Sequence, residues 1–185
     1  MSIPSVLSGR VIEVPNLLPA PDCAALIARA AAQGFATATI NQGEHRPDIR
    51  SNTRALWRDA ALSQRLWPVV APHVPDIDGA RGVGLWDIWR VYGYTPGQFF
   101  DWHQDGRVTD AAGRSSLMTL MIYLSDGCTG GGTRFADVFS PYIFADFTIQ
   151  PKTGKALLFH HDLSHRGEEV TTGVKHVLRT DVIFE

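Results

Sequence analysis

Two side chains that can bind a metal ion, His103 and Asp105, lie two positions apart in the segment WHQDG. Side chains alternate between the two faces of a β-strand, so this spacing points both of them to the same face. An imidazole beside a carboxylate there would supply two of the three protein ligands of a facial metal site. The pair alone is weak evidence, because most such pairs lie at the surface or form ordinary hydrogen bonds.

The third ligand must come from another strand, and the segment LLFHHDLSHRG offers histidines for it. His161 and His165 are four positions apart and would share one face of a continuous strand, whereas His160 would face away. Parity alone admits either, and we favour His165 because it precedes a turn at Gly167 and the final basic strand. Two histidines and one carboxylate leave three positions open for a bidentate 2-oxoacid and then dioxygen, as in non-haem Fe(II) oxygenases.

A 2-oxoacid such as 2-oxoglutarate has a far carboxylate, which needs a cation if it is buried. The ending GVKHVLRTDVIFE provides Lys175 and Arg179 on one strand face. Arginine could hold the carboxylate with two parallel bonds, whereas lysine would act as a point charge. Hydroxyl groups of Tyr123, Tyr92 and Tyr94 could complete the pocket. The ordinary alternatives are surface cations and aromatic core packing, and the residues alone do not choose between Lys175 and Arg179.

The elements that must position these residues fall into two regions of different texture. Residues up to about 84 form a mostly helical support region. Its expected elements are a short strand over 11–14, a helix from Pro21 and Asp22 to about Gly34, a polar loop with a short strand over 41–57, and a helix over 60–70 that Pro68 would kink or end.

Residues from about 85 to 185 contain short segments rich in Val, Ile, Tyr, Phe and Thr between Gly, Pro and Asp turns, a pattern typical of β-strands. The expected strands are 88–94, 99–103, 116–124, 133–136, 147–149, 156–160, 165–171 and 174–184. About eight such strands indicate a sandwich or jelly roll, with a mouth at one end where ligands can sit.

Composition bounds the class of protein. The chain has 185 residues, of which 44% are hydrophobic and 19% charged, as expected for one globular soluble domain. A net charge of -2 gives no electrostatic reason to expect nucleic acid or an anionic membrane as a partner. Cys23 and Cys128 make neither a disulfide framework nor a zinc ribbon. We see no secretion signal and no apolar stretch of about 18 residues, and therefore expect a cytoplasmic protein.

Five segments follow one another in the order YTPGQFFDWHQDG, LMTLMIYLSDG, GGGTRF, GKALLFHHDLSHRG and VKHVLRTDVIF. Together they resemble the catalytic domain of the prolyl 4-hydroxylase-like 2-oxoglutarate/Fe(II) oxygenases over about residues 90–184. The order of the segments makes the resemblance more specific than any one motif. It implies a mainly β fold with flanking helices, namely a double-stranded β-helix (jelly roll) with N-terminal helices packed on the major sheet, in a single domain of residues 1–185.

The resemblance also implies roles for individual residues. His103, Asp105 and His165 match the iron ligands, and Lys175 matches the cation for the far carboxylate of 2-oxoglutarate. Tyr123 matches a tyrosine that bonds the same carboxylate, and Tyr94 an aromatic residue near the metal-binding end. The implied cofactors are Fe(II) and the co-substrate 2-oxoglutarate, with dioxygen, and with ascorbate as a candidate reductant.

The expected reaction is hydroxylation of an unactivated C–H bond of a prolyl residue in a peptide or protein, or of a small amino-acid-like metabolite. Many family members carry glutamate after the third histidine, where this chain has Arg166. That position could reach the substrate, so the substrate class does not transfer. Two alternatives stand beside this expectation: a cupin-like metal-binding jelly roll acting as an isomerase or sugar-binding module, and an inactive member serving as an interaction domain.

Two segments are expected to form mobile edges of the mouth, residues 45–54 and the glycine-containing loop 126–132. Within the first, Arg50, Asn52 and Arg54 could contact the substrate, although a solvated charged loop is the simpler expectation.

Overall fold

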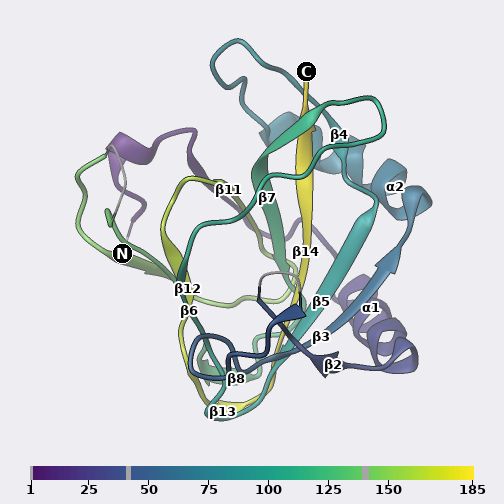
Figure 1. The fold of residues 1–185 in the computed structure, drawn as a ribbon, viewed down its shortest axis with the longest axis vertical. Helices are drawn as coiled ribbons and strands as arrows, with labels where there is room; N and C mark the ends of the chain where they lie inside the picture. Colours follow the sequence, from purple (N-terminus) through teal and green to yellow (C-terminus); the bar gives the residue numbers. More distant parts are fainter. Residues whose placement is uncertain (1, 41–42, 139–141) are drawn as a thin grey trace.

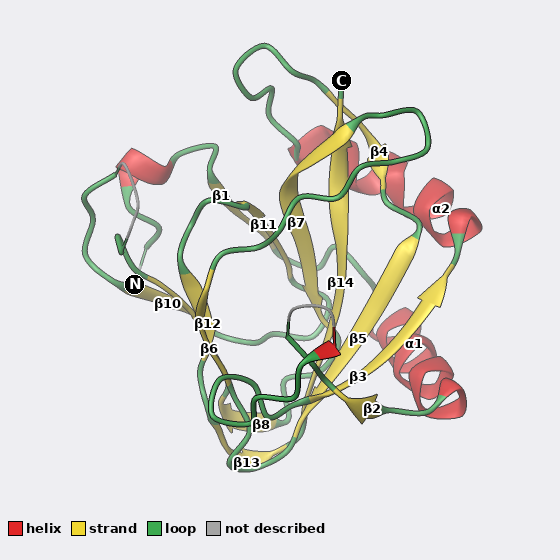
Figure 2. Ribbon diagram, in the orientation of Figure 1, coloured by secondary structure: helices red, strands yellow, loops and turns green. Residues whose placement is uncertain are grey.

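The computed structural model describes residues 2–40, 43–138 and 142–185, and β-strands dominate it (Figures 1 and 2). The large sheet has eight strands, in the order β1-β11-β7-β14-β5-β3-β2 with β4 paired to β14. Its strands are β1 (Val11–Val14), β2 (Ala36–Thr37), β3 (Thr53–Arg58), β4 (Gly82–Leu85), β5 (Ile88–Tyr94), β7 (Ser115–Tyr123), β11 (Ala156–His160) and β14 (Lys175–Phe184).

A smaller sheet of four strands lies opposite part of the large one, in the order β10-β9-β12-β6. Its strands are β6 (Phe100–His103), β9 (Thr133–Phe135), β10 (Phe147–Ile149) and β12 (His165–Gly167). Strands β8 (Cys128–Gly130) and β13 (Val170–Gly173) pair as a separate ribbon. Apolar side chains from both sheets, among them Phe135, Phe147, Phe159 and Val177, form one buried cluster between them. This double sheet is the expected jelly roll.

Two helices cover the outer face of the large sheet, α1 (Ala20–Gln33) and α2 (Ala60–Val70), as Figure 1 shows. Leu26 of α1 and Leu66 of α2 share a second core cluster with sheet residues such as Trp89. The predicted packing of N-terminal helices on the major sheet is thus confirmed. Short 3₁₀ turns occupy Ser5–Leu7 and Ala71–His73. None of the helices in the described ranges has both the length and the apolar character needed to cross a membrane.

Local sequence explains where α2 begins and where both helices end. The carboxylate of Asp59 accepts a hydrogen bond from the backbone N–H of Leu62 and so caps the start of α2. Pro68 lies inside α2, which ends two residues later and continues as the 3₁₀ turn. Helix α1 stops at Gly34, whose φ of 90° favours glycine.

Alternation along β14 sets the two faces of the large sheet. Leu178 and Val182 pack with the helices, whereas Val177 packs between the sheets. The same period of two therefore turns Lys175 and Arg179 toward the interior that the two sheets enclose.

Three expectations need correction. The predicted strand 165–171 is two strands in different sheets, because the chain turns at Glu168, whose N–H donates to the Gly132 carbonyl, and then meets the Gln98 carbonyl through the N–H of Val170. Residues 128–130 of the predicted loop 126–132 form β8. The N-terminal region supplies strands β1 to β4 as well as helices; its separation from a catalytic core at about residue 84 stays a prediction.

Candidate metal centre and co-substrate pocket

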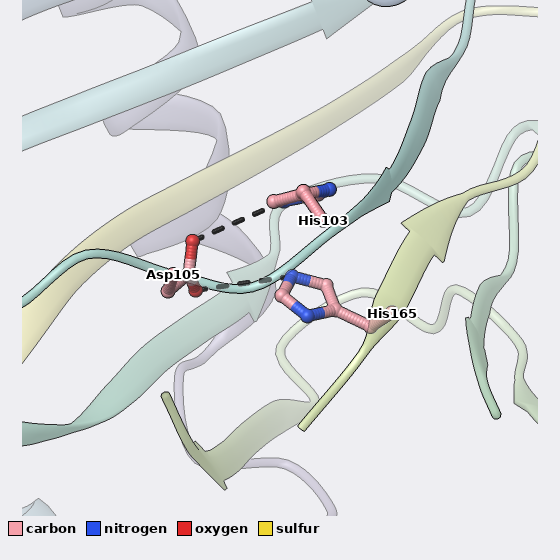
Figure 3. A group of neighbouring side chains, drawn as sticks. All are labelled: His103, Asp105 and His165. Carbon is pink, nitrogen blue, oxygen red and sulfur yellow. Dashed lines mark ion pairs between the residues drawn. The ribbon is translucent and has the colours of Figure 1, made fainter. Parts of the chain in front are cut away.

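Pairing of β6 with β12 brings the candidate metal ligands together. His103 ends β6 and lies directly opposite His165, the first residue of β12, and Asp105 follows two residues after His103. Each residue offers one ligand atom, and these atoms all lie within 4.8 Å of one another. The Nε2 atoms of His103 and His165 lie 3.9 and 3.8 Å from the two carboxylate oxygens of Asp105 (Figure 3).

Both imidazoles direct Nε2 toward the Asp105 carboxylate, because in each ring Nδ1 is engaged with a backbone carbonyl. The Nδ1 of His103 lies 2.7 Å from the Asp101 carbonyl, and the Nδ1 of His165 lies 3.0 Å from the Leu163 carbonyl. Burial lowers the pKa of His103 to about 3 and also lowers the pKa of His165. The rings are therefore neutral, each Nδ1–H donates to a carbonyl, and each Nε2 lone pair is free for a metal ion.

Asp105 completes the donor set as an ionised carboxylate. Burial alone would raise its pKa, but the charge of Arg179 holds the pKa well below its usual range. Its Oδ2 accepts a 2.5 Å hydrogen bond from the Thr119 hydroxyl, and its Oδ1 lies 3.0 Å from Nη2 of Arg179. Two neutral imidazoles and one carboxylate fit ferrous iron.

His161 does not join this cluster. Residues 161–164 form a turn between β11 and β12, so strand parity does not carry from His161 to His165. The Nε2 of His161 lies 3.3 Å from Oδ1 of Asp181 instead. His160 contacts Arg10 away from the site, as its parity predicts.

A cavity of about 370 Å³ opens onto the three candidate ligands. Four of the five side chains predicted to bind the co-substrate line it, namely Tyr92, Tyr94, Lys175 and Arg179. Apolar side chains of Met121, Phe159 and Val177 form part of the wall.

Lys175 is a buried cation in this cavity, 2% exposed. Its Nζ donates to the Gly131 carbonyl at 2.7 Å and lies 4.1 Å from the centre of the Tyr94 ring. Burial lowers the pKa of Lys175 to about 8. Within the described residues it has no ion-pair partner, so its charge is available to a ligand.

Arg179, the other candidate for the far carboxylate, is already engaged. Its Nη2 lies 3.0 Å from Asp105 and 3.2 Å from Asp181. These carboxylates raise the pKa of Arg179 even though burial opposes the charge. Of the two predicted cations, Lys175 is therefore the one that the described carboxylates leave unpaired.

Tyr123 lies behind the cavity wall instead of in it. Its hydroxyl donates to Thr133 Oγ1 at 2.7 Å, and burial raises its pKa. Thr133 does line the cavity. Sequence reasoning missed Thr133, although its place directly after three glycines in GGGTRF marked a position that a ligand could approach.

The segment around residue 50 is not the solvated loop that was expected. Arg50 and Asn52 are buried, with Nε of Arg50 donating to Oδ1 of Asn52 at 2.8 Å. The guanidinium lies against Tyr92 and Phe100, and Arg50 lines the cavity. Aromatic rings and one amide thus bury a residue whose type predicts exposure.

Arg166 turns away from the site. It follows His165 on β12, so it occupies the opposite face, and its guanidinium lies 5.7 Å from the centre of the Trp102 ring. Arg166 is not among the described residues that line the cavity. The expected contact of this position with substrate therefore lacks support.

Comparisons with known proteins agree with this site. The model of the 2OG-Fe(II) oxygenase superfamily matches residues 89–180. A search among curated proteins found no match.

Solved structures with a similar fold include one bacterial and one viral prolyl hydroxylase. A Pseudomonas putida prolyl-4-hydroxylase has a TM-score of 0.70 and 18% identity, over 96% of this chain and 95% of that one. The viral collagen prolyl hydroxylase of Paramecium Bursaria Chlorella virus-1, in its 2OG complex, has a TM-score of 0.66 and 22% identity, over 94% and 96%.

An animal prolyl hydroxylase is similar as well. The enzyme from Trichoplax adhaerens, in complex with a hypoxia inducible factor peptide fragment, has a TM-score of 0.71 and 14% identity, over 96% of this chain and 85% of that one. At these identities the three likenesses establish the fold.

Proposed function

The chain belongs to the 2OG-Fe(II) oxygenase superfamily, and we propose that it hydroxylates an unactivated C–H bond of a prolyl residue or of a small amino-acid-like substrate. Members of this family are 2-oxoglutarate-dependent dioxygenases that use Fe(II). The family match favours this reading over the cupin-like alternative and over an inactive interaction domain.

The observation that carries the proposal is the convergence of His103, Asp105 and His165 beside a buried lysine. Three ligand atoms lie within 4.8 Å of one another, and both histidines offer Nε2. These residues would hold ferrous iron on one face and leave its other positions to the co-substrate and dioxygen.

The chain's other cavity residues would hold and shield the co-substrate. Lys175 would receive the far carboxylate of 2-oxoglutarate, and the Thr133 hydroxyl would donate a hydrogen bond beside it. Met121, Phe159 and Val177 would exclude water from the space between this carboxylate and the metal ligands. Bound iron and 2-oxoglutarate supply the oxidation, in which dioxygen gives one oxygen atom to succinate, released with carbon dioxide, and one to the C–H bond of the substrate.

A direct test is succinate formation by the full chain with Fe(II), 2-oxoglutarate and dioxygen, followed by a screen of prolyl peptides and free amino acids for a mass gain of one oxygen. His103→Ala should abolish succinate formation and iron binding, because two ligands remain. His73→Ala, at an exposed histidine in the 3₁₀ turn after α2, is the matched control and should change neither. Unchanged succinate formation by His103→Ala would refute the assigned ligand.

A further inference from the structure

Four arginines surround Tyr92 on the inner face of the large sheet. Arg54 lies directly opposite Tyr92 across β3 and β5, and Arg179 lies directly opposite Arg90 across β14 and β5. The guanidinium of Arg50 lies 4.6 Å from the centre of the Tyr92 ring. One phenol therefore sits among Arg50, Arg54, Arg90 and Arg179.

Among the described residues, only two carboxylates offset these four charges. Asp181 lies 3.5 Å from Arg90 and 3.2 Å from Arg179, and Asp105, which also contacts Arg179, belongs to the metal centre. Neither Arg50 nor Arg54 forms an ion pair within the part of the chain that the structure describes. Arg50 is buried, and a buried cation without a counter-charge is costly, so it calls for an anion from outside.

Two arginines of this group line the cavity, Arg50 and Arg179, and of these Arg179 is already paired with carboxylates. Arg50 is therefore the one to examine for a ligand. It is 6% exposed, lines the cavity, and has a buried Nη2 without a hydrogen-bond partner among the described groups. An unpaired buried N–H costs about 1–3 kcal/mol, more when the group is charged. The remaining contacts of the side chain, Asn52 and two aromatic rings, fix the guanidinium in place.

The neighbouring titratable groups sense the same positive field. Burial alone would raise the pKa of Tyr92, yet the charges of Arg179, Arg50 and Arg90 bring it below its ordinary value. The pKa of Arg54 is lowered by burial and then by repulsion from Arg50 and Arg90. The arginine charges around Tyr92 therefore favour a negatively charged group at this place.

This region is separate from the place of the co-substrate's far carboxylate. In the register of β14 with β5, Lys175 lies opposite Tyr94, whereas Tyr92 lies opposite Val177, two residues further along β14. Phe100 connects Arg50 with the metal centre. The centre of its ring lies 4.1 Å from the guanidinium carbon of Arg50 and 3.6 Å from the centre of the His103 ring, on which it stacks. One aromatic ring thus separates Arg50 from the candidate iron ligand His103.

We propose that Arg50, with the Tyr92 hydroxyl beside it, binds a carboxylate of the primary substrate, which makes that substrate a small carboxylic acid such as a free amino acid. The inference rests on the proposed hydroxylase function and names its substrate class. The cavity supports a small molecule, since its 370 Å³ lies near the lower end of the range for ligand sites and must also hold 2-oxoglutarate.

The first test uses the unaltered full chain with Fe(II) and 2-oxoglutarate. Succinate formation is measured with free L-amino acids, L-proline among them, each beside its C-terminal amide, and with a prolyl peptide blocked at both ends. At least one free acid should raise succinate formation about tenfold more than its amide does, as expected for loss of a charge-assisted hydrogen bond. Three outcomes would overturn the inference. The acid and its amide could stimulate equally, the blocked peptide alone could stimulate, or no acid could stimulate although succinate forms without added substrate. If no succinate forms under any condition, the proposed function itself fails.

The second test compares Arg50→Gln with the control Arg58→Gln. Arg58 is an exposed arginine at the end of β3 and forms an ion pair with Asp87. Arg50→Gln should raise the KM for the stimulating acid by about 10- to 100-fold and should raise the Kd for 2-oxoglutarate by much less. Arg58→Gln should match the unaltered enzyme, and thermal unfolding checks that each variant folds. A larger effect of Arg50→Gln on 2-oxoglutarate than on the acid would assign Arg50 to the co-substrate and contradict the inference.

Discussion

Arg179 holds the carboxylate of Asp105 from the last strand of the large sheet, with 3.0 Å between Nη2 and Oδ1. Thr119 donates to the other carboxylate oxygen and lies 3.2 Å from the same guanidinium nitrogen. Because Oδ1 faces His103 and Oδ2 faces His165, these two contacts fix the plane of the carboxylate between the imidazoles. The large sheet thus orients a candidate metal ligand that the chain segment after β6 supplies.

Replacement of Arg179 by methionine should destabilise the metal-free protein. Asp105 and Asp181 would remain buried without their shared cation, and breaking a buried ion pair costs about 3–5 kcal/mol. Fe(II) affinity should also fall by about 10- to 100-fold, since the ligand loses its orienting contact. Urea unfolding of the metal-free protein and Fe(II) titration measure the two effects.

The matched control is Arg114→Met, which removes a partly exposed pair with Asp110. It should cost less than about 1 kcal/mol, as surface pairs do. Equal unfolding midpoints for Arg179→Met and Arg114→Met would contradict a structural role for the Arg179–Asp105 contact.

Lys175→Met should weaken 2-oxoglutarate binding strongly and leave folding intact. Loss of one partner of a buried charge pair costs about 2–5 kcal/mol, or roughly 30-fold or more in Kd. The metal-free, ligand-free variant should be at least as stable as the unaltered protein, because burial disfavours the Lys175 charge. Calorimetric titration without dioxygen gives the Kd, and Lys152→Met, at an exposed lysine, should bind normally.

The pH dependence of 2-oxoglutarate binding follows from the same lysine. Burial lowers the pKa of Lys175 from 10.5 to about 8, so the charged form prevails below pH 8 and is lost above it. The Kd for 2-oxoglutarate should be level below pH 8 and then rise toward tenfold per pH unit. The free energy of unfolding depends on pH in the opposite direction. Between pH 8 and 10.5 the unfolded chain binds more protons than the folded chain, so the destabilising effect of the buried Lys175 charge decreases as pH rises. A flat Kd between pH 7 and 9.5 would exclude Lys175 as the carboxylate's partner.

Strand parity and spacing sufficed to predict that His103 and Asp105 share a face, because that signal is local. Parity could not choose between His161 and His165, since it assumes a continuous strand where the chain turns at 161–164. The order of the family's segments made that choice, and the geometry agrees with it.

The surroundings of Arg50 could not be read from its own segment. Its burial depends on Tyr92 and Phe100, more than forty positions later in the chain. The pairing of β3 with β5 brings Tyr92 alongside, and an isolated bridge between Arg50 and Phe100 brings the second ring. Arginine is usually exposed, so residue type predicted the wrong environment. Thr133 differs, because the glycines before it marked a position that a ligand could approach; only its contact with Tyr123, ten positions earlier, lay outside its segment.

That contact between Tyr123 and Thr133 leads to a prediction that separates their roles. The Tyr123 hydroxyl donates to Thr133 Oγ1, so the proton of the Thr133 hydroxyl is free to point into the cavity that Thr133 lines. If Thr133 donates this proton to 2-oxoglutarate, Thr133→Val should raise the Kd by about 10-fold or more, as for a hydrogen bond to a charged group.

Tyr123→Phe should raise the Kd for 2-oxoglutarate less than Thr133→Val does, because it removes only the contact that orients the threonine. The double variant should then bind no more weakly than Thr133→Val alone, since the two side chains act through one hydrogen bond to the ligand. Calorimetric titration of the three variants forms a complete cycle. A larger loss for Tyr123→Phe than for Thr133→Val would instead favour direct contact between the tyrosine and the co-substrate, as the family resemblance implied.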